Sequence, residues 1–151
     1  MFKRIALTLD GSELSESALT HVTDIISDCH AADVVLMRIK EPLDPNVIGT
    51  LDAKVAVELD EAYRDEAARY LDKVVETLKE KGIAAKTEVL SGNPAEEIIK
   101  YSQKNDIDLI IMSTRGRSGI SRLVFGSVAE KVIRNSTVPV LIKPPRQTKS
   151  E

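Results

Sequence analysis

The stretch DLIIMSTRGRSGISRLVFGSVAEKVI, residues 108–133, combines the patterns of a strand, a loop and a helix. It opens with a short apolar run, which is typical of a strand buried on both faces. Apolar residues recur at helical spacing from residue 128 onward. Between these two patterns lies a segment with three glycines and three arginines. The stretch therefore predicts a strand joined to a helix by a long loop.

The same succession of apolar runs and helical patterns continues along the chain. Five runs have the character of buried strands, at residues 2–10, 33–39, 84–90, 106–112 and 138–143. A helix between two such strands implies a right-handed crossover onto a parallel sheet. We therefore expect an α/β fold, with a single doubly wound parallel sheet and helices on both of its faces. The domain would span residues 1–143, followed by a polar tail at 144–151.

Two helices have boundaries with specific signals. Asn93 is placed as an N-cap, Pro94 as the first helical residue and Glu96 for a capping box. A longer helix is expected over about residues 55–81, with Gly82 as its stop. Its periodicity predicts one buried face, formed by Leu59, Tyr63, Ala67, Tyr70, Leu71, Val74 and Leu78. The preceding segment, 40–53, contains two prolines and a glycine and is expected to be a loop able to act as a lid.

Composition and charge argue against several classes of function. The 151 residues carry a formal net charge of −3, which disfavours a nucleic-acid partner. The apolar runs are shorter than the roughly 18 residues of a membrane span, and the N-terminus lacks the apolar core of a signal peptide. We therefore expect a folded cytoplasmic protein with no membrane partner. Its single cysteine, Cys29, is expected to be a buried structural thiol.

The ends of the strands are the places to look for a ligand site. In open parallel sheets, ligands bind outside the carboxyl ends of the strands, where the strand order reverses. Asp10 and Gly11 follow the first strand, and the glycine-rich segment follows the fourth. Its glycines at 116, 119 and 126 allow the backbone to approach a ligand, and the helix starting near Gly126 and Ser127 offers N–H groups to an anion.

A simpler interpretation is that these glycines only turn the chain. A turn needs few residues, whereas residues 113–126 separate the strand from the helix. We therefore favour a phosphate site over a turn. The arginines of the segment either add positive charge to that site or are merely solvated; they are Arg115, Arg117 and Arg122.

Motifs of nucleotide hydrolysis are missing from the sequence. It contains no G-x-x-x-x-G-K-[ST] loop, no G-x-G-x-x-G after the first strand and no G-x-S-x-G nucleophile elbow. His21 and His30 lie in or at the end of the first helix and are expected at the surface. Cysteine and histidine do not cluster, so a metal would be Mg²⁺ or Mn²⁺ carried by phosphates and reached by Asp10.

These residues resemble the universal stress protein family over nearly the whole chain. The similar segments are KRIALTLDGSELSESAL, SGNPAEEII and, most specifically, DLIIMSTRGRSGISRLVFGSVAEKVIRNSTVPVLIK. The ATP-binding branch of that family is marked by G-2X-G-9X-G-[ST]. The corresponding residues here are Ser113, Gly116, Gly126 and Ser127, so that a serine replaces the first glycine.

The resemblance implies an ATP site, a strand order and a dimer. By position, the nucleotide-binding residues would be Thr8, Leu9 and Asp10 of the first strand, Ile39 of the second, Met112 and Ser113 of the fourth, and Arg115, Gly116, Arg117, Gly126, Ser127 and Val128 around the phosphates. The strand order would be 3-2-1-4-5, as in Rossmann-like sheets. Residues 138–142 would pair across a two-fold axis in a homodimer and so cover an apolar sheet edge.

Three functions remain open at this point. The leading hypothesis is an ATP-binding stress or regulatory protein, with slow or no hydrolysis, whose nucleotide state is read by an unidentified protein partner. The second is a slow Mg-dependent ATPase in which Asp10 positions the metal. The third is a nucleotide-free dimeric interaction module, which Ser113 favours. AMP and cyclic AMP remain alternatives to ATP as the adenine nucleotide.

Overall fold

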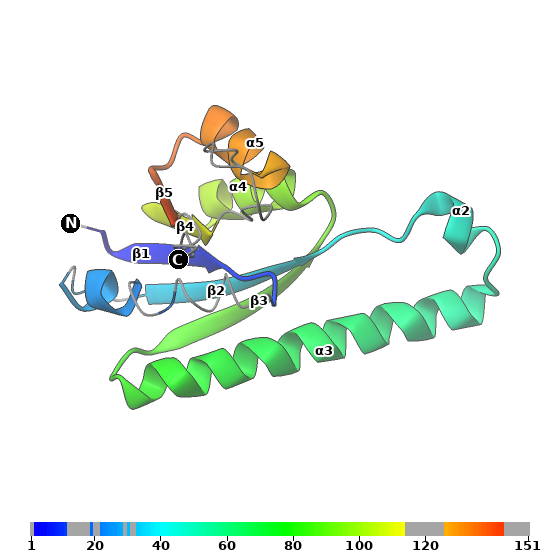
Figure 1. The fold of residues 1–151 in the computed structure, drawn as a ribbon, viewed down its shortest axis with the longest axis horizontal. Helices are drawn as coiled ribbons and strands as arrows, with labels where there is room; N and C mark the ends of the chain where they lie inside the picture. Colours follow the sequence, from blue (N-terminus) through cyan, green and yellow to red (C-terminus); the bar gives the residue numbers. More distant parts are fainter. Residues whose placement is uncertain are drawn as a thin grey trace, which may run out of the picture.

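The sheet has five strands, all parallel, in the order β3-β2-β1-β4-β5. The structure, a computed structural model, describes residues 2–11, 19, 22–28, 30, 33–113 and 126–143. Figure 1 shows the sheet at the centre, with the helices in a layer on each side. The strands are β1 Arg4–Thr8, β2 Asp33–Lys40, β3 Ala85–Ser91, β4 Leu109–Ser113 and β5 Val140–Lys143. The predicted doubly wound fold and its strand order are confirmed.

The two faces of the sheet bury separate apolar clusters. Residues 5–7 of β1 are fully buried, because neighbouring strands and both helix layers cover them. Alternation along the strands sends Leu36 to one cluster and Met37 to the other. One face packs against residues 22–28, which are helical, and against α3 Ala53–Glu80. The other packs against α4 Pro94–Lys104 and α5 Ser127–Asn135.

The predicted helix boundaries agree with the structure. The Asn93 side chain caps α4 by accepting a hydrogen bond from the Glu96 N–H at 3.3 Å, and Pro94 is the first helical residue. Gly82 follows α3 with a φ of +77°, a left-handed conformation that glycine adopts without strain. His30 is exposed, as expected. Cys29, His21 and the tail at 144–151 lie outside the described residues.

The segment between β2 and α3 departs from its prediction as a loop. It contains a short helix, α2 Pro45–Ile48, in which the Asp44 side chain accepts a hydrogen bond from Asn46 N–H and Pro45 starts the helix. An aspartate followed by proline is a helix-start signal, so this short helix has a cause that can be recognised in the sequence. Figure 1 shows α2 and the first half of α3 extending well beyond the sheet.

The predicted buried face of α3 is correct only in its second half. Ala67, Leu71, Val74 and Leu78 are buried. Leu59 and Tyr63 are 39% and 46% exposed, which corrects their assignment to the core. A helix of 28 residues is about 42 Å long, whereas a strand of seven residues spans only about 23 Å. The sheet therefore ends before the helix does.

At the amino ends of the central strands, Asp108 holds the chain that leads into β1. Its Oδ2 accepts hydrogen bonds from the N–H groups of Lys3 and Arg4, each at 2.9 Å. The hydrogen bonds from Arg4 and Lys3 lower the pKa of the Asp108 carboxyl from its ordinary value, since they favour the charged form. They fasten the start of β1 to the turn before β4. Of the helices that the structure describes, none has the length and apolarity needed to cross a membrane.

Candidate functional site

A cleft of about 630 Å³ opens at the carboxyl ends of β1, β2 and β4. Its walls also include the segment after β2, one turn of α3 and the start of α5. The cleft lies beside the junction of β1 with β4, where the strand order changes direction. This is the switch point at which open α/β sheets bind ligands, and the volume is within the usual range for small-molecule sites.

The end of β1 supplies Thr8, Leu9 and Asp10 to the cleft. Leu9 continues the sheet pairing, because its N–H donates to the Met37 carbonyl at 2.9 Å. Gly11 then has a φ of +84°, so the backbone turns sharply directly after Asp10. The turn leaves the Asp10 residue exposed at the mouth of the cleft.

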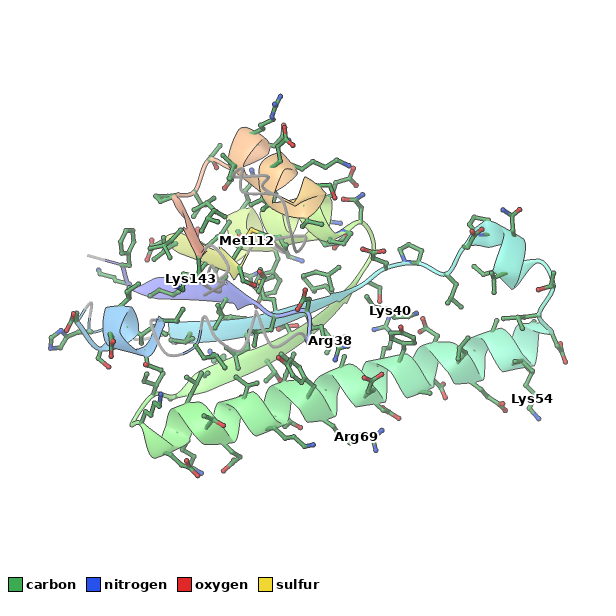
Figure 2. The ribbon with its side chains drawn as sticks, viewed as in Figure 1. Arg38, Lys40, Lys54, Arg69, Met112 and Lys143 are labelled. Carbon is green, nitrogen blue, oxygen red and sulfur yellow. The ribbon has the colours of Figure 1, made fainter. Side chains whose placement is uncertain are left out.

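The end of β2 presents different chemistry on its two faces. Ile39 packs with the apolar cluster under α4 and α5 and also lines the cleft. Arg38 and Lys40 point the other way, toward α3, as Figure 2 shows. Both line the cleft, and neither was singled out by the sequence analysis.

Arg38 and Lys40 are held by α3. The Arg38 guanidinium lies 5.2 Å from the centre of the Tyr70 ring, and its Nη2 is 3.8 Å from Glu66 Oε1. Lys40, with only 8% of its side chain exposed, forms an ion pair with Asp60. These pairings fix α3 against β2 and balance the two positive charges, so the side chains shape the cleft wall without giving it a strong positive field.

The end of β4 and the start of α5 form the third wall. Met112 is 4% exposed and Ser113 ends the strand. Ser113 is not among the described residues with positive φ, so the serine is not strained where the family pattern has glycine. Gly126, the N-cap of α5, has φ −55° and ψ 155°. A Cβ added to Gly126 would meet no described atom within 4 Å.

The starts of α4 and α5 differ in how their N–H groups are satisfied. Asn93 caps α4 with its side chain, whereas glycine has no side chain with which to cap α5. The first hydrogen bond within α5 runs from Glu130 N–H to the Gly126 carbonyl at 3.0 Å. The N–H groups of residues 127–129 therefore have no acceptor within the helix. Gly126, Ser127 and Val128 all line the cleft, so the positive end of this helix dipole borders it.

Nine predicted site residues line the same cleft: Thr8, Leu9, Asp10, Ile39, Met112, Ser113, Gly126, Ser127 and Val128. The other three, Arg115, Gly116 and Arg117, lie outside the described residues, as do Gly119 and Arg122. Residues that sequence reasoning missed include Leu43, Tyr63 and Ala67. Their presence depends on where the α2 segment and α3 lie in space, for which the sequence contained no signal.

The cleft contains carboxylates but no preformed metal cluster in the described part of the chain. Asp10, Glu41 and Asp44 are the carboxylates among its lining residues. Two groups with displaced pKa values lie elsewhere. They are Asp108 and Tyr101, whose pKa is raised by burial and by the Glu88 carboxylate that accepts its hydroxyl hydrogen bond at 3.4 Å.

A parallel sheet of order 3-2-1-4-5 with a ligand-sized cleft at its switch point defines a Rossmann-like α/β protein. The chain belongs to the Universal stress protein family, which it matches over residues 1–144. Universal stress protein MJ0531 of Methanocaldococcus jannaschii is 35% identical over 143 residues, covering 94% of this chain and 82% of that relative.

Solved structures of the family share this fold. Protein MJ0577 of Methanocaldococcus jannaschii superposes with a TM-score of 0.82 at 28% identity, over 98% of this chain and 99% of that one. A universal stress protein solved in complex with cAMP gives a TM-score of 0.72 at 21% identity, over 96% of this chain and 99% of that chain. The second likeness supports the fold alone.

Proposed function

We propose that this protein is a cytoplasmic ATP-binding regulatory member of its family, with slow or no hydrolysis. The observation that carries the proposal is the start of α5, where the N-cap residue Gly126 has no side chain and the N–H groups of residues 127–129 have no acceptor within the helix. A phosphate group fits such a site because both the N–H donors and the helix dipole favour an anion.

The remaining walls suit the rest of an adenine nucleotide. In the proposal, Ile39 offers its backbone to adenine, and Met112 and Ser113 lie against adenine and ribose. Thr8 and Leu9 line the nucleotide edge of β1. The phosphates meet Ser127 and Val128, together with Arg115, Gly116 and Arg117 of the adjoining segment. Mg²⁺ or Mn²⁺ arrives with the phosphates within reach of Asp10, whose carboxylate is a suitable oxygen ligand.

Two further considerations support an adenine nucleotide. A family member solved in complex with cAMP has the same fold, so the fold accommodates this class of ligand. The extended conformation of Ser113 also weakens the case for a nucleotide-free module, since that case depended on a glycine being needed at this position. ATP remains preferred to AMP or cAMP in the proposal because α5 offers several N–H donors to a chain of phosphates.

The test compares Gly126→Asp with Gly126→Asn. Both side chains are good N-caps and should keep or slightly raise the melting temperature, whereas both intrude into the cleft. Only aspartate adds a negative charge. If phosphate lies here, calorimetry with Mg-ATP should show micromolar binding to the native protein and at least about tenfold weaker binding to the aspartate variant than to the asparagine variant.

Two results would overturn the proposal. One is the absence of heat from the native protein at millimolar Mg-ATP. The other is equal ATP affinity for the aspartate and asparagine variants, which would mean that no anion lies near residue 126. Parallel titrations with AMP and cAMP decide between the nucleotides, because their shorter or cyclised phosphates would lose donors that ATP engages.

A further inference from the structure

The segment after β2 and the first half of α3 form an arm, defined here as residues 41–66. Figure 1 shows it extending away from the sheet, with α2 at its far end. Most of the large apolar residues exposed in the described structure lie on this arm: Val47, Ile48, Val55, Val57, Leu59 and Tyr63. The exception is Ile133 on α5. Such a concentration marks a surface that another molecule covers.

The apolar residues of α3 form one continuous ridge. Val55, Leu59 and Tyr63 follow one another at intervals of four residues, and Ala67 and Leu71 continue the row. The last two are buried against the sheet, whereas the first three lie where the sheet has ended. A ridge of this spacing is the surface that packs into the grooves of another helix. Its exposed half therefore has the shape of a helix-docking site.

The charge of the arm identifies the kind of partner. Residues 41–66 contain eight carboxylates and only two basic residues, Lys54 and Arg64, giving the arm a net charge of −6. Because the whole chain has a net charge of −3, the other residues together carry +3. The arm is thus the acidic pole of the molecule. Nucleic acids and anionic membrane surfaces are repelled by such a field.

Charge also opposes the pairing of two arms from two copies. In an antiparallel pair centred on Leu59, Glu58 would face Asp60 and Asp52 would face Glu66. Like charges at these positions destabilise paired helices. We propose that the arm binds an amphipathic helix of another protein whose apolar stripe is flanked by lysine or arginine. The ridge supplies the apolar contacts, and the surrounding carboxylates select the basic flanks.

The docking surface adjoins the cleft. Tyr63 belongs to the apolar ridge and also lines the cleft. Leu43 and Asp44, which precede α2 in the arm, line the cleft as well. A helix seated on the ridge would therefore lie beside whatever the cleft contains. That this helix senses bound nucleotide rests on the proposed function; the docking itself does not, and it is tested without nucleotide.

The experiment uses a fluorescent synthetic peptide of about five helical turns, with leucine in an i, i+4 row and lysine on both flanks. Anisotropy with the full chain should show binding that is weakened about tenfold by Val55→Ser combined with Leu59→Ser. Ile133→Ser, which removes an exposed apolar residue elsewhere, should leave the affinity unchanged. Exchanging the lysines for glutamate in the peptide should abolish binding.

A second pair of substitutions guards against misfolding of the serine variant. Glu58 and Glu61 are exposed, so Glu58→Lys with Glu61→Lys should preserve the melting temperature while weakening binding of the basic peptide. Equal binding of a sequence-scrambled peptide would overturn the proposal, as would equal losses in the ridge and Ile133 variants. Sedimentation showing an oligomer that Leu59→Ser dissociates would assign the ridge to a second copy instead.

Discussion

Gly126 and Ser113 have backbones that any residue can adopt. Gly126 has a φ of −55°, and Ser113 lies in a strand. The fold therefore does not require glycine at residue 126 for conformational reasons, in contrast to Gly92, whose φ is +140° and whose Cβ would approach the Glu97 side chain within 2.9 Å. The sequence revealed the glycines but not which of them the backbone needs, because that depends on φ.

Ser102 provides a prediction about stability. It is 1% exposed on the inner face of α4, and its Oγ has no hydrogen-bond partner within the described part of the chain. A buried hydroxyl without a partner is destabilising, so Ser102→Ala should raise the free energy of unfolding by about 1 kcal/mol. Urea unfolding measures this change. Gln103→Ala, at the exposed neighbouring residue, controls for the helix propensity of alanine. An equal gain in the free energy of unfolding there would show that the buried Ser102 hydroxyl is not the cause.

Asp108 provides a prediction about pH. Its folded-state pKa lies below the ordinary value of 3.8, so its contribution to stability is complete above that pH and is lost as the pH falls through the lowered pKa. Asp108→Asn should therefore be less stable than the native protein at pH 6, with the difference shrinking toward pH 3. Urea unfolding at both pH values checks this. A difference that does not change with pH would contradict the assignment.

Asp106→Asn is the matched control for Asp108. The Asp106 side chain is 88% exposed and lies 3.7 Å from Arg4, with only a weak ion pair to lose. Its replacement by asparagine should leave both the stability and its pH dependence nearly unchanged. If instead the two variants behave alike, the general reduction of negative charge would explain the result, and the two hydrogen bonds to Lys3 and Arg4 would not.

At the scale of elements, α3 shows what periodicity can and cannot predict. The spacing of its apolar residues predicted one continuous face, and the ridge from Val55 to Leu71 is indeed continuous. The apolar face of α3 is buried only where another element packs against it, and the sheet extends under only half of the helix. The length of the neighbouring strands was the missing quantity, because strand ends are set by pairing between segments far apart in the sequence.

The strand β5 lies at the edge of the sheet and carries a prediction about assembly. The Ile110 N–H donates to the Pro139 carbonyl at 3.0 Å, so the odd-numbered residues of this strand bond to β4 and the backbone groups of 140 and 142 face outward. If the β5 edges of two copies pair, as proposed, sedimentation should show a dimer at micromolar concentration. Ile142→Pro, which removes an outward N–H, should give a monomer.

The melting temperature of the Ile142→Pro variant shows whether a monomeric variant is still folded or has lost its structure. A folded monomer would support pairing through β5, since the bonds to β4 are kept. A native protein that is already monomeric at about 10 µM, or a dimer unaffected by the proline, would exclude this edge as the interface. Lysine at 140 or 142 is a less clear test, because both side chains pack against the apolar cluster below α5.

At the scale of the whole molecule, local patterns predicted the layers but not the complete cleft. Alternating strands and helices fixed the parallel sheet, whereas the strand order and the identity of the site residues came from resemblance to a family. Arg38 and Lys40 were missed because strand alternation alone does not say which face meets α3. Their ion pairs with Glu66 and Asp60 exist only after β2 and α3, distant in sequence, come together.

The composition of the cleft predicts slow turnover if ATP is bound. Asp10, Glu41 and Asp44 are the carboxylates among its described lining residues, and neither histidine nor cysteine occurs among them. The sequence of residues 114–125 adds three arginines but no carboxylate or histidine that could orient water. We therefore expect phosphate release on the order of one per minute or slower, against about 10 s⁻¹ for a typical enzyme. Release at several per second that Asp10→Asn abolishes would instead make this protein an ATPase, because Asp10 would then hold the metal during the reaction and not merely border the ligand.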